Sequence, residues 1–462
     1  MADNLFDAFE PVSSKQWKQQ IQYELKGADY NDTLVWESPE GIKVRPFYHD
    51  DESEVTRGKA ELGGAKFTLK ENGKSFQILQ NIYVHDVALS NKRASDTLNR
   101  GAESIRFTIE NEIVSIDDLM HNLPLENTSY FFYLPFLSID FVSKINEFAN
   151  KSKAKCIIQL DPVGQLAKDG NWFENLDNDF DMLNKIAAVN DVPFVNVNAS
   201  IYQNSGANMV QQLGYTLAHL NEYFNRIKNF NQPITVEVSV GTNYFFEIAK
   251  LRALRLLFNT LAAEYNHTHQ CHFIVTPTKR NKTLYDYNVN MLRTTTECMS
   301  AILGGADSIA NLPYDALYHK DNEFGDRIAR NQLLVLKHES YFDKVSNPAD
   351  GAYYIEALTE QLAEKALLLF KEIEEKGGFI TQLIEGSIQK KISESAAKEQ
   401  ELFDSGKEVL LGTNKYPNKN DKMKHDLELY PFLKQKPRKT LITPIIEKRL
   451  AEKLEQERLA TE

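Results

Sequence analysis

The side chains best able to bind a transition metal gather in one short stretch of the sequence. His267, His269, Cys271 and His272 fall within six residues, and imidazole and thiolate groups are common ligands of Zn²⁺. The two histidines at the start of the stretch belong to a predicted turn, whereas Cys271 and His272 begin a predicted strand. Their side chains should therefore diverge, and the stretch lacks the separated ligand pairs of a usual site. We predict no metal site here.

Phosphate-binding motifs are also absent from the sequence. Neither G-x-G-x-x-G nor G-x-x-x-x-G-K-[ST] follows any β-rich run. The polar residues that do follow β-rich runs are Asp161, Asn198, Ser200, Tyr202, Gln203, Asn243, Tyr244, Thr276, Thr278, Lys279, Asn311 and Tyr314. Only Asp161 and Lys279 among them are charged, and general acid–base catalysis normally uses a histidine or a pair of carboxylates. We therefore expect these residues to bind polar groups but not to carry out proton chemistry.

The elements that position these residues alternate between β-rich and helical patterns. The eight β-rich runs cover residues 76–84, 104–109, 130–136, 156–162, 193–200, 234–241, 272–276 and 307–311. Several are apolar on both faces, which is typical of buried parallel strands. Helical patterns lie between them, for example at residues 138–149, 182–189, 209–227 and 245–265. This alternation predicts an α/β fold with an eight-stranded TIM-type barrel. A doubly wound open sheet is the alternative.

Two further regions flank the predicted barrel. We expect an N-terminal extension at residues 1–75, the barrel at 76–345, and a C-terminal helical region at 346–462. In the last region, residues 352–376 carry apolar side chains at helical spacing and end at Gly377 and Gly378. Residues 415–439 are rich in Lys, Asn and Pro, which predicts an extended linker. A final helix is predicted at 444–459.

Composition excludes several classes of partner. The chain of 462 residues has a formal charge of −12, so a nucleic-acid partner is disfavoured. The longest largely apolar run, residues 130–142, is shorter than the roughly 20 residues that span a bilayer, which predicts no membrane segment. Residues 1–10 resemble neither a secretory signal nor a transit peptide, and the three cysteines suggest no disulfide framework. We expect a cytoplasmic protein.

Eight stretches resemble one protein family. They are LKGAD at 25–29, LVWESPEGI at 34–42, RTTTE at 293–297, LGGADS at 303–308, RIARN at 327–331, NPADGAYYIEALT at 347–359, GTNKYPN at 412–418 and RLAE at 449–452. In type and order they are similar to the methylmalonyl-CoA mutases, adenosylcobalamin-dependent enzymes that interconvert methylmalonyl-CoA and succinyl-CoA. The resemblance implies the same eight-stranded barrel, with coenzyme A threaded along its axis.

The sequence departs from the catalytic members of that family at several sites. The cobalt-ligating D-x-H-x-x-G motif does not occur. Where the family's G-Y-H-x-x-E-A-G-A run supplies a substrate-facing histidine, this sequence has Ile201, followed by Gln203. Ile274 and Thr276 align with the H-x-Q-T-S-G strand, and residues 74–80 replace the Y-x-x-R-P-W-T-I-R-Q segment. The resemblance therefore implies a vestigial substrate pocket at Ile201, Gln203, Ile274 and Thr276, with no catalytic residue.

These departures favour a small, non-catalytic subunit of a heterodimeric methylmalonyl-CoA mutase. A larger homologous chain would then carry the acyl-CoA substrate, adenosylcobalamin and the radical chemistry, and this chain alone would bind no cofactor. Leu5, Phe6, Phe9 and Trp17 are the side chains that we expect to contact the large chain, although each is equally suited to packing on its own barrel.

Two other functions remain open at this point. One is a catalytic acyl-CoA mutase barrel that uses a separately encoded cobalamin-binding chain. It is disfavoured because the side chains of Ile201 and Ile274 cannot donate a hydrogen bond to a thioester carbonyl. The other is a retained acyl-CoA pocket with a regulatory role, which ligand-dependent stabilisation would reveal.

Overall fold

The fold is built on one closed sheet of parallel strands. The computed structural model describes residues 9–52, 75–433 and 437–462. The eight strands of the closed sheet follow the order β6-β5-β4-β3-β10-β9-β8-β7. Their bounds are β3 Gln77–Tyr83, β4 Ser104–Thr108, β5 Ser129–Tyr133, β6 Lys155–Gln159, β7 Asn196–Asn198, β8 Thr235–Val240, β9 His272–Pro277 and β10 Ser308–Ile309. A parallel bridge between Leu160 and Val195 joins the two end strands, so the sheet closes into a barrel.

Helices surround the barrel and alternate with its strands. They are α3 Val87–Asn99, α4 Ile116–Leu119, α5 Ile139–Ser152, α6 Pro162–Asp169, α7 Leu176–Val189, α8 Ser200–Asn204, α9 Met209–Arg226, α10 Tyr244–Glu264, α11 Val289–Leu303 and α12 Glu323–His338. The predicted TIM-type barrel is therefore confirmed, and the doubly wound open sheet is wrong. All eight β-rich runs contain one strand each.

Local sequence explains where several of these helices begin. The Ser138 side chain accepts a hydrogen bond from the backbone N–H of Phe141 and caps α5. Asp161 caps α6 in the same way, with Pro162 in the first turn. Asn208 and Gln211 form a capping box at the start of α9. The caps of α5 and α6 mark where the chain passes from β5 and β6 into the helices that follow them.

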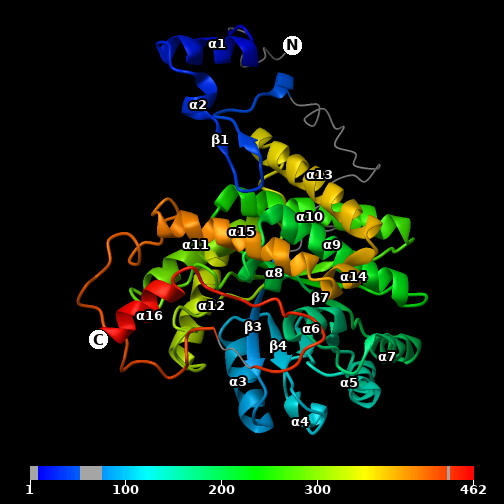
Figure 1. Ribbon diagram of the computed structural model, residues 1–462. Coiled ribbons are helices and arrows are strands. Elements are labelled where there is room, and N and C mark those ends of the chain that lie inside the picture. The colour runs from blue at the N-terminus through cyan, green and yellow to red at the C-terminus, as the bar shows by residue number, and fades with distance from the viewer. Residues whose placement is uncertain (1–8, 53–74, 434–436) are drawn as a thin grey trace, which may run out of the picture.

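The N-terminal extension projects from the barrel. It contains α1 Ser14–Glu24, α2 Tyr30–Leu34, the antiparallel pair of β1 Trp36–Glu37 and β2 Lys43–Val44, and a 3₁₀ turn at Asp50–Glu52. In Figure 1, α1 and α2 stand away from the barrel, and the β1–β2 hairpin reaches down toward it. Ile42, in the hairpin, is buried in the main apolar core, so the hairpin is the part that attaches the extension to the barrel.

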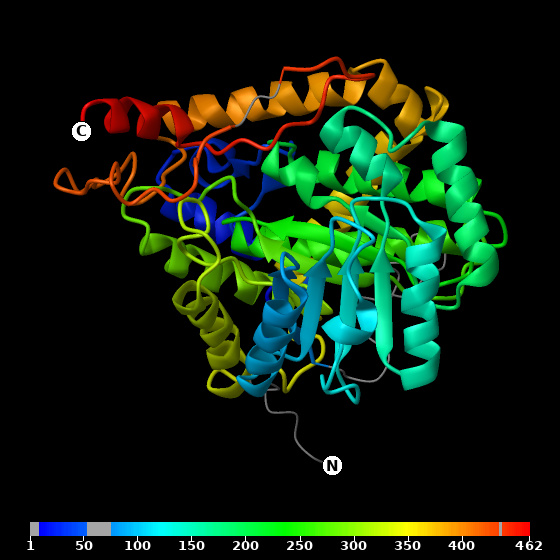
Figure 2. The same cartoon turned by 90° about the horizontal axis from the view of Figure 1, so that it is seen from below.

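The C-terminal region packs along one side and one end of the barrel. It comprises α13 Tyr353–Glu375, α14 Gly378–Ile384, α15 Ser387–Asp404 and α16 Glu452–Ala460. Leu358, Leu362 and Ala366 of α13 are buried in the main core. Figure 2 shows α15 and the segment before α16 lying together across the end of the barrel. This region therefore covers the end of the barrel at which the strands finish.

The predicted helix at 444–459 is wrong over its first half, because α16 begins only at Glu452. Backbone N–H groups in the preceding segment bond to carbonyls of α6, α8 and the segment after β9 instead of carbonyls four residues back. Ile445 donates to Ala167 at 2.8 Å, Lys448 to Asn204 at 3.0 Å and Leu450 to Arg280 at 2.9 Å. Tertiary contacts thus override the helical pattern of the sequence.

In the ranges that the structure covers, no helix has both the length and the hydropathy of a membrane span.

Candidate functional site

The barrel axis is filled by apolar side chains of the chain itself. Leu79, Phe131, Ile157, Ile274 and Ala310 come from β3, β5, β6, β9 and the end of β10, and they form one buried cluster. Because alternate residues of a barrel strand point inward, side chains from five separate strands can meet on the axis. Phe131 also lies against His272 of the opposite strand, with ring centroids 5.3 Å apart. This packing leaves no room for a ligand that threads through the barrel.

A polar layer crosses the same axis. Arg106 Nη1 of β4 lies 2.6 Å from Glu237 Oε2 of β8, and these two strands are on opposite sides of the barrel. Glu237 Oε1 accepts hydrogen bonds from Gln159 at 3.3 Å and Asn196 at 3.0 Å. Arg106 Nε also donates to Asn81 at 2.8 Å. Side chains from β3, β4, β6, β7 and β8 therefore form a second layer that fills the barrel axis.

Ile201, at the position aligned with the substrate-facing histidine, lines only a very small cavity. The volume of this cavity is only about 30 Å³. Asp161, Asn198 and Glu447 also line it. Asn204 Nδ2 donates to Glu447 Oε1 at 3.2 Å, so the C-terminal segment that carries Glu447 closes this cavity. An acyl group cannot occupy it.

The other three predicted pocket positions, Gln203, Ile274 and Thr276, do not lie together with Ile201. Ile274 belongs to the apolar cluster on the axis, and Thr276 is the next residue on the same face of β9. Gln203 lines a different, large cavity. Its amide is held by internal partners, since it accepts from Lys250 Nζ at 3.0 Å and donates to Glu247 at 3.1 Å. The four positions therefore form no common pocket.

The large cavity has a volume of about 1110 Å³ and lies beside the barrel end. The β1–β2 hairpin, the segment after α8, the ends of β8 and β9, and α15 form its walls. Lys250 is buried next to it and ion-pairs with Glu247 at 2.5 Å, while burial lowers the pKa of Lys250. Its ammonium group also donates to Gln212 at 2.9 Å and to the Ser239 carbonyl at 2.7 Å.

Adenosylcobalamin is the cofactor implied by the resemblance, and its cobalt would need an imidazole ligand. No histidine is among the described residues that line the large cavity. His219, on α9 nearby in the fold, is fully buried and has both ring nitrogens within hydrogen-bond distance of other groups. The side chains at this cavity therefore do not fit a cobalt centre.

Sequence reasoning missed the buried network around Asp161. His219 Nε2 lies 2.9 Å from Asp161 Oδ1, and Tyr223 donates to the same oxygen at 2.6 Å. Burial alone would raise the pKa of Asp161, but the His219 charge and these hydrogen bonds hold that pKa below its ordinary value. The Tyr202 hydroxyl lies 2.9 Å from His219 Nδ1. Asp161 and His219 are 58 residues apart in the sequence, so only the position of α9 beside β6 reveals this network.

The strand-end residues named from the sequence include no histidine, but the structure places one at the barrel rim. His85 follows β3 by two residues and is exposed to solvent. His85 lines neither of the two cavities described above.

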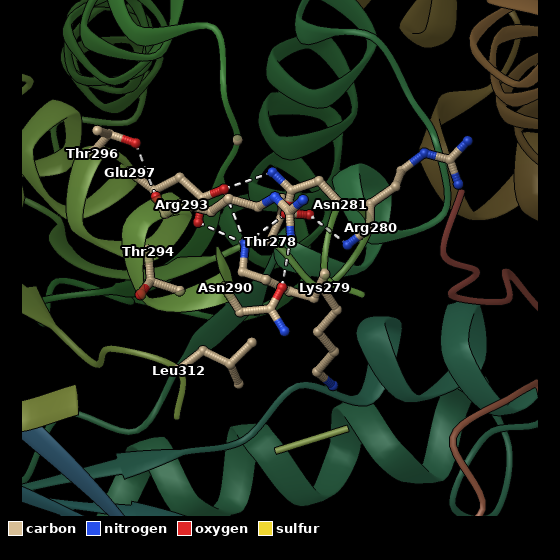
Figure 3. Close-up of polar contacts among 12 residues, drawn as sticks. Thr278, Lys279, Arg280, Asn281, Asn290, Arg293, Thr294, Thr296, Glu297 and Leu312 are labelled. Atoms are coloured by element: carbon tan, nitrogen blue, oxygen red, sulfur yellow. Dashed lines mark hydrogen bonds and ion pairs between the residues drawn. The ribbon is translucent and has the colours of Figure 1, made fainter. Parts of the chain in front are cut away.

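Several polar side chains of the segment that follows β9 form hydrogen bonds and ion pairs with other parts of the chain. Lys282 Nζ donates to both oxygens of Glu297, at 3.0 and 2.7 Å, and Asn281 donates to one of them at 2.6 Å. Burial lowers the pKa of Lys282 and raises that of Glu297. Figure 3 shows Arg293 and Asn290 on the same side as Glu297, while Arg280 points away from them. Arg280 pairs with Glu399 of α15.

The side chains of the 267–272 stretch lie in different surroundings, although the rings of His267 and His269 have centroids 5.9 Å apart. His267 packs among Phe224, Phe230 and Phe258. Cys271 is buried, and His272 lies inside the barrel, with Nε2 2.9 Å from Ser308 Oγ. Across the described ranges, no three His, Cys, Asp or Glu side chains are arranged to hold one ion.

The predicted partner contacts lie in the N-terminal extension. Leu5 and Phe6 fall outside the described residues. Phe9 is 74% exposed and Trp17 is 45% exposed. Trp17 stacks on Phe47 of its own extension with centroids 4.4 Å apart, so part of its apolar surface is already covered.

Comparison with known proteins places the chain in a family. Residues 111–457 match the methylmalonyl-CoA mutase family. The methylmalonyl-CoA mutase small subunit of Porphyromonas gingivalis is 34% identical over 446 residues, which cover 90% of this chain and 71% of that protein. The methylmalonyl-CoA mutase of Rhizobium meliloti is 27% identical over 88% of this chain and 64% of its own length.

The mitochondrial methylmalonyl-CoA mutase of Bos taurus is 27% identical over 87% of this chain. The matched region covers 60% of the bovine protein, so this chain spans between 60% and 71% of the length of the three relatives named here. The match runs through the barrel and the C-terminal region described above. By sequence, the chain belongs to the methylmalonyl-CoA mutase family.

Proposed function

We propose that this chain is the small, non-catalytic subunit of a heterodimeric methylmalonyl-CoA mutase. A larger homologous chain carries out the interconversion of methylmalonyl-CoA and succinyl-CoA, and this chain supports it as a structural partner. The isolated chain has no mutase activity.

The observation that carries this proposal is the closed barrel axis. Phe131 and Ile274 fill it with apolar atoms, and the ion pair between Arg106 and Glu237 spans it. A catalytic barrel must admit the long coenzyme A thioester and hold donors against its carbonyl group. The cavity at Ile201 is small, with a volume of about 30 Å³. These features thus oppose the catalytic alternative and any acyl-CoA pocket on the barrel axis.

The cofactor and the substrate belong, on this proposal, to the large chain. Ile201, Gln203, Ile274 and Thr276 are vestigial substrate-pocket positions that now serve packing and internal hydrogen bonds. Adenosylcobalamin supplies the radical chemistry of the complex when the large chain binds it. The name of the Porphyromonas gingivalis relative, a small subunit, supports this division of roles.

The N-terminal extension, residues 1–75, is the segment that we assign to docking on the large chain. Its α1 helix has a single buried residue, Ser14, and Phe9 and Trp17 leave apolar surface exposed. Apolar surface on a projecting element marks a contact with another protein. The barrel at 76–345 and the region at 346–462 complete the proposed organisation. Three free cysteines support a cytoplasmic location, where thiols remain reduced.

Reconstitution tests the proposal. The chain and the large homologous chain are purified separately and together, and each sample is assayed with adenosylcobalamin and methylmalonyl-CoA. We expect a one-to-one complex with activity and no turnover by this chain alone. Turnover by the lone chain, or by the chain with a separate cobalamin-binding domain, would contradict the proposal.

Binding of acyl-CoA gives an independent readout. We expect the thermal unfolding midpoint of the isolated chain to stay the same in 1 mM succinyl-CoA. At this concentration, a ligand with a Kd of 10 μM would stabilise the folded protein by about 2.7 kcal/mol, so binding would be detected. A clear rise in the midpoint would show a working acyl-CoA site and favour the regulatory function.

A further inference from the structure

The large cavity beside the barrel end has walls of different charge. On the side of α15, basic and acidic side chains are equal in number. They are Lys391, Lys398, Lys407 and Arg280 against Glu394, Glu399, Glu401 and Glu408. The wall made by the β1–β2 hairpin contributes Glu37 and Glu40, and no basic side chain of the hairpin lines the cavity. Negative charge that the lining does not balance therefore lies on the hairpin wall.

Glu40 is held at the turn of the hairpin with one oxygen unpaired. Its Oε1 accepts a hydrogen bond from the N–H of Met209, the first residue of α9, at 3.3 Å, so the carboxylate has a fixed position. Oε2 is buried and has no hydrogen-bond partner among the described residues. Burial raises the pKa of Glu40, and the charge of Glu247 raises it further, whereas Ser38 and backbone N–H groups lower it. A buried carboxylate without a counter-charge is unfavourable.

The buried Lys250 does not supply that counter-charge. Its ammonium group pairs with Glu247 at 2.5 Å and donates to two glutamine side chains and one backbone carbonyl. Because an ammonium group has three donor hydrogens, these contacts occupy it fully. Lys365 of α13 approaches the hairpin turn at Gly41, but it does not line the cavity, and no ion pair in the described part of the chain joins it to Glu40. The charge of Glu247 is thus matched, whereas that of Glu40 is not.

An aromatic ring stands on the same wall as Glu40. Trp36 lines the cavity and is 49% exposed, and it meets Phe246 edge to face with ring centroids 5.7 Å apart. The face of an indole ring attracts cations, and this attraction is strongest for Trp among the aromatic residues. The cavity volume of about 1110 Å³ is that of a site for an organic molecule rather than for a single ion. A carboxylate and an indole on one wall therefore suit an organic cation.

We infer that the large cavity binds a small organic cation, whose ammonium group pairs with Glu40 and whose carbon chain lies against Trp36. The bound cation supplies the counter-charge that the empty cavity lacks. Glu40 thus lowers the stability of the empty chain and raises that of the occupied one. The site belongs to this chain alone, so its failure would leave the proposed function intact.

Thermal unfolding of the full chain tests whether the cavity prefers an organic cation. The midpoint is measured at pH 7.5 in 10 mM n-butylammonium chloride, 10 mM KCl and 10 mM NaCl. We expect butylammonium to raise the midpoint by at least about 1 °C over NaCl, since a ligand stabilises the state that binds it, and KCl to leave it unchanged. No rise with butylammonium, or an equal rise with KCl, would overturn the assignment to an organic cation.

The variant E40Q tests the carboxylate. Because it removes an unbalanced buried charge, we expect the midpoint of the empty chain to rise and the shift caused by butylammonium to disappear. E37Q, which removes the same charge from an exposed residue of the same wall, should keep the wild-type shift. A wild-type shift in E40Q would overturn the inference. A midpoint of empty E40Q below that of the wild type would also overturn it, because Glu40 would then be compensated within the chain.

The variant W36L tests the place of the carbon chain. Loss of the indole should raise the Kd for butylammonium about two- to fivefold in isothermal titration calorimetry, as for an exposed cation–π contact. F245L replaces another aromatic side chain that is 49% exposed but does not line the cavity, and its Kd should equal that of the wild type. Equal Kd values for W36L and the wild type would contradict the contact with Trp36.

Discussion

Arg106 and Glu237 meet in the middle of the barrel, with Nη1 and Oε2 2.6 Å apart. They come from β4 and β8, which are on opposite sides of the ring, and their side chains are 14% and 8% exposed. A contact between opposite strands can form only across the axis. The pair is therefore both part of the core and the barrier that closes the barrel to a ligand.

Removing one member of this pair should destabilise the chain strongly. E237Q leaves the Arg106 guanidinium buried without a counter-charge, and such a loss costs about 3 to 5 kcal/mol. We expect the free energy of unfolding, measured by urea titration, to fall by that amount. D96N, which removes the partner of the exposed Arg100, should cost less than about 1 kcal/mol.

Replacing both members tests the cause. In R106M/E237L, no buried charge is left unpaired, so we expect much of the stability lost in E237Q to return. A double variant as unstable as E237Q would show that side-chain volume, rather than the unpaired charge, explains the loss.

Restoring the histidine at the aligned catalytic position should not restore activity. Ile201 is buried beside a cavity of about 30 Å³, so I201H puts a polar ring of different shape into a packed site. We expect a loss of about 1 to 3 kcal/mol in unfolding free energy and no turnover with adenosylcobalamin and methylmalonyl-CoA. Measurable turnover by I201H would mean that the acyl pocket is intact.

His267 should make stability depend on pH. Burial among Phe224, Phe230 and Phe258, together with the nearby His269, lowers its pKa below the ordinary value of 6.5. The unfolded chain therefore takes up this proton more readily, so stability is lost as the pH falls below about 6.5 toward the folded-state pKa.

The variant H267F isolates this effect, because a phenyl ring fits the same aromatic surroundings without a titrating group. Between pH 7.5 and pH 5, we expect its thermal unfolding midpoint to fall less than that of the wild type. Parallel pH profiles for the two proteins would show that His267 does not titrate in this range.

Phe9 provides a test of the docking segment. Its side chain is 74% exposed, so F9S should leave the unfolding free energy of the isolated chain within about 0.5 kcal/mol of the wild type. If the N-terminal extension docks on the large chain, the Kd of the complex should rise at least tenfold, as for an aromatic residue central to an interface. V189S, which replaces an exposed apolar side chain at the end of α7, is the control and should leave the Kd unchanged.

The pattern along the sequence determined most of the barrel. Runs such as 130–136 and 156–162, apolar on both faces, predicted β5 and β6, and Ser138 marked the start of α5. These features are local, because strand burial and helix caps depend on residues within a few positions of one another. The family resemblance also predicts that Ile201 and Ile274 stand in place of polar groups.

Tertiary structure decided what fills the axis and where the C-terminal segment lies. The contact between Arg106 and Glu237 joins residues 131 positions apart, and Asp161 meets His219 only because α9 lies against the end of β6. Residues 444–451 carry a helical pattern, yet their N–H groups bond to Ala167, Asn204 and Arg280 of the barrel. Contacts of this kind depend on strand order and on competition between distant partners, which no local pattern encodes.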